Sequence, residues 1–168
     1  GNKKTNFRQI AERNLEKQGG KSKDIRAREI RGKKVDFDGL ELKVTSYETE
    51  VSTEHFIEYV TKEDLIAGFL RLSLPKKNIF MDEIDGKAMI REVHVYGQSV
   101  EIGNTKQGRA QHIGIGRSLM EKAEEIAKKE GFDEISVISS VGTREYYEKS
   151  GFSHVRTGKN LYQHKKLI

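Results

Sequence analysis

The sequence predicts one mixed α/β domain of the α+β class, preceded by a basic helical arm. Apolar residues change from helical spacing to period-two alternation near residue 40, and a strand–helix–strand unit follows between residues 87 and 140. The composition, 35% hydrophobic and 34% charged over 168 residues, is typical of one globular domain. We therefore expect an arm over residues 1–36 and a domain over residues 37–168, built on one sheet.

The arm begins with a predicted helix and carries the positive charge of the chain. Phe7, Ile10 and Leu15 repeat at helical spacing, and Gly19 and Gly20 end the pattern. Residues 1–34 hold twelve Lys and Arg against four Asp and Glu, a net of +8, whereas the rest hold nineteen against twenty-two, a net of −3. Such an arm is either a solvated segment or a contact surface for a polyanion, most commonly nucleic acid.

The first part of the domain is predicted to be antiparallel strands. Apolar and polar residues alternate over residues 40–45, as in a half-buried strand. Residues 55–61 and 64–74 are the next two predicted strands, and the polar turn between them makes a hairpin. Pro75 closes this hairpin, because proline cannot donate a hydrogen bond to a central ladder.

The longest predicted strand spans residues 87–100, and Gly97 within it predicts a bulge. A polar loop over residues 101–110 then leads to a helix that we expect to begin near Gly114 and to end at Gly131. Its buried stripe is expected to consist of Ile115, Leu119, Ala123, Ile126 and Ala127.

The last part of the chain is predicted to complete the sheet. Residues 134–140 form a short apolar strand, and "TREYYEKSGF" forms a short helix that Gly151 ends. The tail is expected to form two strands around a turn at Thr157 and Gly158.

Several classes of function are excluded by composition. The chain has no cysteine, which excludes disulfides, iron–sulfur clusters and cysteine-rich zinc sites. No stretch approaches the roughly 20 apolar residues of a membrane span, and no secretory signal is evident. We expect a cytoplasmic protein that does not bind membranes, and we predict no metal site.

The stretch "QHIGIG" places Gly114 and Gly116 at the start of the predicted helix. Glycines at this position can serve close helix–sheet packing or can let the backbone approach an anion. A dinucleotide-binding turn is disfavoured, because its third glycine position holds Leu119, and no Gly-Lys-Ser/Thr follows for a nucleotide triphosphate loop. The remaining alternative is a pyrophosphate loop for acyl-coenzyme A, with Arg117 adding positive charge.

The flanking segments carry a family resemblance over nearly the entire chain, from about Thr5 onward. Gln111-x-x-Gly114-x-Gly116 resembles motif A of the GNAT acetyltransferases. The segments "TNFRQ", "DIRAREI", "FLRLSLP", "IREVHVYG" and "ISVISSVGTREYYEKSGF" together resemble the Elongator catalytic subunit family of tRNA uridine acetyltransferases. The resemblance implies a GNAT fold, a mostly antiparallel sheet with a splayed parallel pair, and acetyl-CoA as cofactor.

The resemblance also implies roles for particular residues. The strand Glu92, Val93, His94 and Val95 would contact pantetheine through its backbone, and Tyr147 would donate a proton to the departing sulfur. Glu92 is either a surface charge or a base that orients water, and His94 is either structural or catalytic; Tyr146 could be the core-packing neighbour of Tyr147. The residues implied to hold the rest of the cofactor are Gln111, Gly114, Ile115, Gly116, Arg117 and Ser118.

In this family the arm joins a radical S-adenosylmethionine domain, which holds an iron–sulfur cluster, to the acetyltransferase domain and contacts tRNA. The basic residues that we expect to contact phosphates are Lys3, Lys4, Arg8, Arg26 and Arg28. Relatives often carry cysteines at or near Ser22 and Ala27, some of which bind zinc; this chain has none, so no zinc site is carried over.

The expected function is that of the acetyl-CoA-binding domain of an enzyme that acts on C5 of the wobble uridine of tRNA and cleaves acetyl-CoA in a tRNA-dependent way. The expected partners are tRNA, acetyl-CoA and the radical domain in cis, and a homodimer is left open. One alternative is a protein lysine N-acetyltransferase. The other is a tRNA-binding module with an inert cofactor site.

Overall fold

The computed structural model describes residue 3 and residues 5–30, 39–77, 80–96, 106–154 and 162–167, with backbone alone for 106–113. Its helices and strands run in the order α1 Phe7–Lys17, β1 Glu41–Glu48, β2 Ser52–Val60, β3 Ile66–Pro75, β4 Ala88–Val95, α2 Lys106–Lys129, β5 Glu134–Ile138, a 3₁₀ turn Val141–Thr143, α3 Arg144–Lys149, β6 Ser153–His154 and β7 Tyr162–Lys166. This mixed α/β architecture confirms the predicted fold class.

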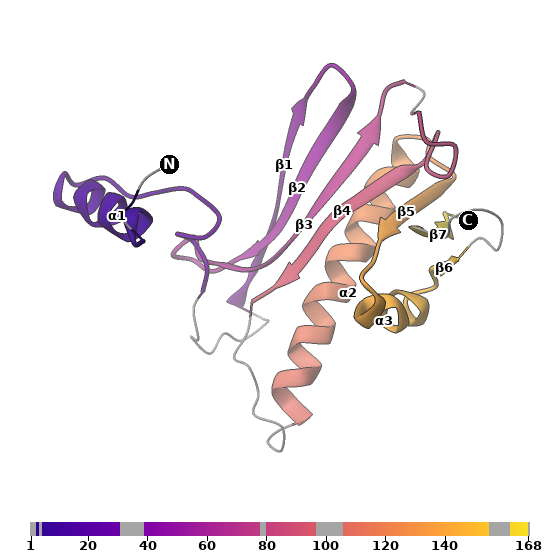
Figure 1. The fold of residues 1–168 in the computed structure, drawn as a ribbon. Coiled ribbons are helices and arrows are strands. Elements are labelled where there is room, and N and C mark those ends of the chain that lie inside the picture. Colours follow the sequence, from indigo (N-terminus) through magenta and orange to yellow (C-terminus); the bar gives the residue numbers. More distant parts are fainter. Residues whose placement is uncertain are drawn as a thin grey trace.

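One seven-stranded sheet organises the described residues, in the order β1-β2-β3-β4-β5-β7-β6. Every neighbouring pair is antiparallel except β4 and β5, which are parallel. A parallel pair requires a crossover connection, and α2 supplies it by packing across the sheet (Figure 1). The β2–β3 hairpin confirms the two strands that the sequence predicted there.

The first strand is longer than the alternation suggested. It continues to Glu48 and forms a second hairpin with β2, which begins at Ser52. The turn is held by Thr49, whose hydroxyl donates to the carbonyl of Ser52 and accepts from its amide, both at 2.9 Å. These local bonds of a threonine side chain define the turn, where the sequence has neither glycine nor proline as a signal.

The main hydrophobic core lies between α2 and one face of the sheet. Leu119, Met120 and Ala123 of α2 are buried against sheet residues such as Leu70 and Ile90. The expected stripe of α2 is confirmed: Ile126 is partly buried and the other four members are buried. Gly68 of β3 permits the close approach, because a β-carbon there would lie 2.8 Å from Cγ2 of Ile115.

The second half of the arm is attached to the edge of β3, where Glu29 forms a parallel bridge with Ile66. The amide of Ile66 donates to the carbonyl of Arg28 at 2.6 Å, and the amide of Ile30 donates to the carbonyl of Ile66 at 3.2 Å. Ile25 packs against the buried cluster of Val60, Ile66 and Phe69. By contrast, α1 buries no residue and extends away from the sheet (Figure 1). Residues 24–30 are therefore bound to the domain, although they fall within the predicted arm.

The prediction that the long helix begins near Gly114, after a loop over residues 101–110, is wrong. Helix α2 begins at Lys106, so that Gly114 and Gly116 lie within it. A glycine lowers helix stability but does not by itself end a helix, and the apolar stripe downstream anchors the element to the sheet. The predicted bulge at Gly97 lies outside the described residues, as does the turn at Thr157 and Gly158.

The C-terminal strands confirm the predicted end of the sheet. β7 pairs with β5 on one side and with β6 on the other. Among the described residues, no helix is both long and apolar enough to cross a membrane.

Candidate functional site

A fork between β4 and β5 is the most distinctive feature of the sheet. These parallel strands pair only over Ala88–Ile90 and Ile135–Val137, and the described ladder ends there. Beyond it, β4 continues to Val95 but pairs only with β3 on its other side. Over Glu92–Val95, the backbone N–H and C=O groups of β4 that face β5 therefore have no ladder partner among the described residues, and such groups need another hydrogen-bonding partner.

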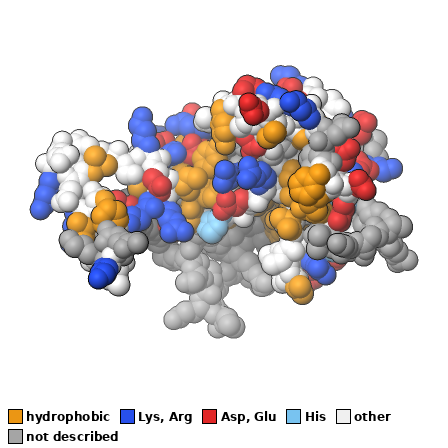
Figure 2. All heavy atoms as spheres, turned by 45° about the horizontal axis from the view of Figure 1, so that its top comes forward, with side chains coloured by type: hydrophobic (Ala, Val, Ile, Leu, Met, Phe, Trp, Pro, Cys, Tyr) orange, Lys and Arg blue, Asp and Glu red, His pale blue; other side chains and the backbone are white. Residues whose placement is uncertain are grey.

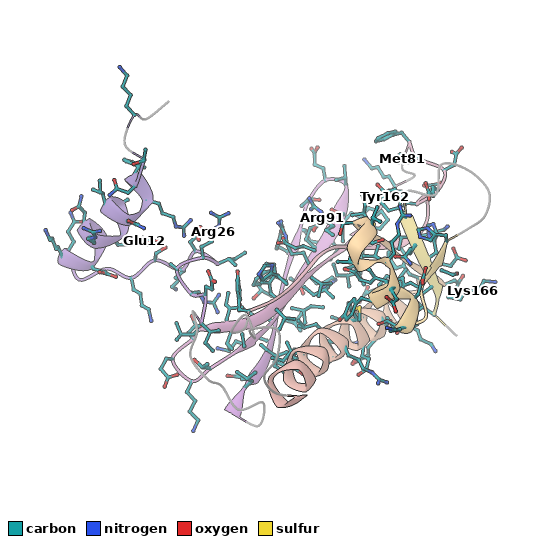
Figure 3. The ribbon with its side chains drawn as sticks, turned by 60° about the horizontal axis from the view of Figure 1, so that its bottom comes forward. Glu12, Arg26, Met81, Arg91, Tyr162 and Lys166 are labelled. Atoms are coloured by element: carbon teal, nitrogen blue, oxygen red, sulfur yellow. The ribbon has the colours of Figure 1, made fainter. Side chains whose placement is uncertain are left out.

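A bulge shapes β4 at the point where the fork opens. Arg71 pairs with Glu92 and Leu72 pairs with Ile90, which leaves Arg91 as the extra residue. Arg91 projects from the sheet on the side away from α2 (Figure 3), where its guanidinium lies 3.3 Å from the buried carboxylate of Glu54. Burial would raise the pKa of Glu54, but hydrogen bonds from Ser73 and Ser52 and the charge of Arg91 outweigh burial and lower it. The bulge is thus fixed by an ionised, hydrogen-bonded carboxylate.

The predicted pyrophosphate residues lie on about two consecutive turns of α2, and the described side chains among them point in different directions. Ile115 is buried against the sheet, and the Ser118 hydroxyl lies 2.7 Å from the Tyr59 hydroxyl. Arg117 is exposed and donates to Glu121 at 2.8 Å, while no described atom lies within 4 Å of a β-carbon placed on Gly114. Gln111 lies in the same helix, and its side chain is outside the described residues. In this conformation the unpaired amides of the helix start lie at Lys106, eight residues before Gly114.

The burial of the two tyrosines of α3 is the reverse of our expectation that Tyr146 could be the core-packing member. Tyr147 is the buried member at 8% exposure and packs edge-to-face on Phe152 with ring centroids 5.9 Å apart. Tyr146 is partly exposed, and its hydroxyl oxygen would lie 2.5 Å from a β-carbon on Gly116. Burial raises the pKa of both tyrosines, so both phenols stay protonated at neutral pH. The sequence motif pointed to Tyr147; the contact of Tyr146 with Gly116 had no signal in the sequence.

The side chains of β4 alternate between the two faces of the sheet. Val93 and Val95 pack against the core on the α2 side. Glu92 and His94 are exposed on the other side, where the Glu92 carboxylate lies 3.9 Å from Arg71 and the His94 ring stacks at 5.9 Å on Phe69. The structure therefore brings the predicted strand and Tyr146 near the same helix, but Glu92 and His94 point away from it.

The basic residues of the arm divide into two groups. Arg28 donates to the Asp64 carbonyl at 3.0 Å, to the Asp64 carboxylate at 2.9 Å and to Glu58 at 3.1 Å. Its side chain is only 12% exposed and that of Glu58 only 6%, so Arg28 is an anchor of the arm and is poorly placed for a phosphate. Sequence alone could not separate it from Arg26, which is exposed on the segment between α1 and the sheet (Figure 3).

Of the other basic positions, Lys3 is exposed and Lys4 lies outside the described residues. Arg8 bonds to Glu12 at 2.8 Å and to Asp24 at 2.5 Å, and these carboxylates raise its pKa. No group of three metal-binding side chains occurs in the described part of the chain.

Comparison with known proteins identifies the domain type. Residues 106–164 match the sequence model of the acetyltransferase (GNAT) domain. The chain is 40% identical over 165 residues to the tRNA uridine(34) acetyltransferase of Methanocaldococcus jannaschii, covering 92% of this chain and 30% of that protein. It is 36% identical over 156 residues to Elongator complex protein 3 of Schizosaccharomyces pombe, covering 88% and 29%.

A solved structure gives the same result. The archaeal Methanocaldococcus infernus Elp3 with an N-terminal deletion superimposes with a TM-score of 0.79 at 35% identity, covering 98% of this chain and 40% of that one. The chain spans about a third of the length of the curated relatives that it matches.

Proposed function

This chain carries a GNAT acetyltransferase domain homologous to the tRNA uridine(34) acetyltransferases and Elongator complex protein 3, and from this premise we propose that it binds acetyl-CoA for modification of tRNA. In the longer protein, which we place in the cytoplasm, the donor group would reach C5 of the wobble uridine through a radical S-adenosylmethionine domain in cis. The observation that carries the proposal is the fork between β4 and β5.

The fork between β4 and β5 supplies hydrogen-bonding groups for the amides of pantetheine. Pantetheine contains two amide groups and is long and narrow, so an extended strand with unpaired N–H and C=O groups complements it in the manner of an added strand. Glu92–Val95 is such a strand, because its β5 side lacks a ladder partner. The pantetheine of acetyl-CoA would enter between β4 and β5 and place its thioester near the open end of β4.

The start of α2 supplies a site for the pyrophosphate once its first turns open. Residues 106–116 include three glycines, each about 1 kcal/mol less favourable than alanine in a helix. The first turn holds no acidic residue that would offset the positive end of the helix dipole. We infer that binding unwinds the segment before Gly114, so that the amides of Gly114–Ser118 become the free donors of a shortened helix and hold the anion.

The tyrosines supply the proton for thioester cleavage. When the C–S bond breaks, a coenzyme A thiolate of pKa about 8.5 leaves and needs a proton. A tyrosine whose pKa is raised by burial remains protonated and can donate it. Tyr147 is the candidate from the motif, and Tyr146 is the candidate from its place against Gly116. Glu92 could orient the attacking water when no acceptor is bound.

The arm supplies part of the tRNA surface. Arg26 and Lys3 are exposed and would contact phosphates, together with Lys4 and with Arg8 if its carboxylate partners are displaced. Such contacts release counterions, so the binding constant should fall steeply with salt and depend little on sequence.

The first experiment is calorimetric titration of the chain with a non-hydrolysable acetyl-CoA analogue. We expect binding, and at a ligand concentration 100 times the dissociation constant a stabilisation of about 2.7 kcal/mol. Gly114→Glu should abolish binding because a carboxylate would occupy the anion site, whereas Gly142→Glu, a change in the turn before α3, tests whether an added charge alone has this effect. Absence of binding by the wild type would favour an inert cofactor site and refute the proposal.

The second experiment measures acetyl-CoA hydrolysis with and without tRNA, in parallel with acetylation of lysine peptides. The proposal expects tRNA to stimulate hydrolysis by the longer protein and expects slow turnover of peptides. Rapid peptide acetylation without a tRNA effect would instead identify a protein lysine N-acetyltransferase.

A further inference from the structure

An aromatic cluster occupies the face of the sheet opposite α2. We define this aromatic platform by four rings on β2, β3, β4 and the residue after β4: Phe56, Phe69, His94 and Tyr96. The ring centroids lie 5.2 Å apart for Phe56 and Phe69, 5.9 Å for Phe69 and His94, and 4.5 Å for His94 and Tyr96. The register explains the cluster, because Phe69 pairs with His94 and residues two apart on a strand share a face.

The platform is open to solvent at one edge. Phe69 is buried at 3% exposure and forms its base, Phe56 and Tyr96 are partly exposed, and His94 is exposed. The ring planes of Phe69 and His94 are within 17° of parallel, so the rings are stacked with the histidine outermost. The space-filling view shows hydrophobic side chains interspersed with basic and acidic ones on one face of the molecule (Figure 2). A planar π-system can therefore continue the stack.

Positively and negatively charged side chains border the aromatic platform. Arg71 and Glu92 lie one step along the sheet from Phe69 and His94, and their side chains are 38% and 45% exposed. Their separation of 3.9 Å is at the limit of an ion pair, and exposed pairs of this kind contribute little to stability. On the other side, Arg26 is close enough to Tyr96 to lower its pKa, although burial and Glu29 raise it more.

These properties select one class of ligand. An aliphatic chain would need a continuous apolar groove, and a protein segment would gain little from an exposed histidine between charges. A nucleobase has two flat faces that stack on aromatic rings and an edge of donors and acceptors. Uracil presents an N–H flanked by two carbonyls, which matches the carboxylate of Glu92 beside the guanidinium of Arg71.

We propose that the aromatic platform binds an unstacked pyrimidine base of the RNA substrate by stacking on His94, while the Tyr96 ring, tilted by 52° to that of His94, borders the base. The inference rests on the proposed function and deepens it, because it assigns the face of the domain on which the base lies. β4 would then carry the base on its side chains and the thioester on its backbone. This shared strand offers a direct route by which RNA could promote acetyl-CoA cleavage.

The test compares two anticodon stem–loop RNAs, one with uridine at position 34 and one abasic there, by fluorescence anisotropy with the full chain. Stacking on an aromatic side chain corresponds to roughly 5- to 150-fold in affinity. We expect the wild type to prefer the uridine loop by a factor in this range, and His94→Ala or Tyr96→Ala to lose most of the preference. Tyr96→Ala, which lies outside the cofactor strand Glu92–Val95, should still bind the acetyl-CoA analogue.

Conservative and matched variants separate stacking from misfolding. Tyr96→Phe and His94→Phe keep an aromatic face and should retain the preference. Tyr47→Ala removes an aromatic side chain on β1 that is 48% exposed on the same face of the sheet but lies outside the platform, and it should leave the preference unchanged.

Equal binding of the two loops by the wild type, or failure to bind either, would overturn the inference while acetyl-CoA binding kept the proposed function standing. A preference that survives in both His94→Ala and Tyr96→Ala would overturn it as well. Absence of acetyl-CoA binding would instead count against the proposed function.

Discussion

The Arg28 anchor gives the sharpest prediction about the arm. In Arg28→Ala three hydrogen bonds are lost, two of which are also ion pairs, and Glu58, whose side chain is 6% exposed, is left without this partner. Breaking a buried pair costs about 3–5 kcal/mol, and because Asp64 is half exposed we take the lower end. For a domain of this size about 1 kcal/mol corresponds to roughly 2–4 °C, so the melting temperature should fall by about 6–12 °C.

Arg26→Ala is the matched control, because it removes the same side chain type two residues away. Because Arg26 is exposed, Arg26→Ala should change the free energy of unfolding by less than about 1 kcal/mol. The same substitution should weaken RNA binding. Hydrogen exchange adds a local measurement: the amides of Ile30 and Ile66, which bond across the arm and β3, should lose protection in Arg28→Ala only. Equal melting temperatures for the two variants, or unchanged exchange at Ile66, would refute the assignment of Arg28 as an anchor.

Three further predictions concern packing, catalysis and pH. Gly68→Ala should destabilise the fold by about 1–3 kcal/mol, because the new methyl group would lie 2.8 Å from Ile115; an unchanged urea midpoint would contradict this. Tyr147→Phe should preserve the melting temperature and slow acetyl-CoA hydrolysis at least tenfold, and an unchanged rate would transfer the proton-donor role to Tyr146. Burial, followed by the charge of Lys87, lowers the pKa of His164 from 6.5. The unfolded chain therefore takes up a proton first, so stability should fall as pH decreases below about 6.5. His164→Gln should flatten this dependence in melting curves, and an equally steep curve would count against it.

The predictability of the fold followed from periodicity. The stripe from Ile115 to Ala127 was visible because α2 buries one face, and one-sided burial leaves a period in the sequence. The alternation over residues 40–45 also located β1, although no residue of β1 is buried and Val44 is 40% exposed. The hairpin at Thr49 and the start of α2 were missed for a common reason. Both depend on which of two local conformations tertiary packing stabilises, and glycine-rich or threonine-centred segments are compatible with either.

The candidate site was predictable only as a set of segments. Motifs located β4, the glycines of α2 and the two tyrosines, because these are contiguous in sequence. They could not show that Tyr147 is the buried ring and Tyr146 the one against Gly116, or that Arg28 is used internally while Arg26 is exposed. Such distinctions arise between residues far apart in the chain, for example Arg28 and Glu58.

The position of β7 in the sheet has a consequence for biosynthesis. β7 lies between β5 and β6. The edges of these two strands that pair with β7 therefore stay unpaired until residues 162–166 have been synthesised. During translation from the N-terminus, β1–β4 can assemble as a meander, whereas β5 exposes an unpaired edge until the ribosome has released Tyr162–Lys166. A nascent chain stalled before this point would present that edge to other chains, so β7 protects the newly made domain from edge-to-edge pairing.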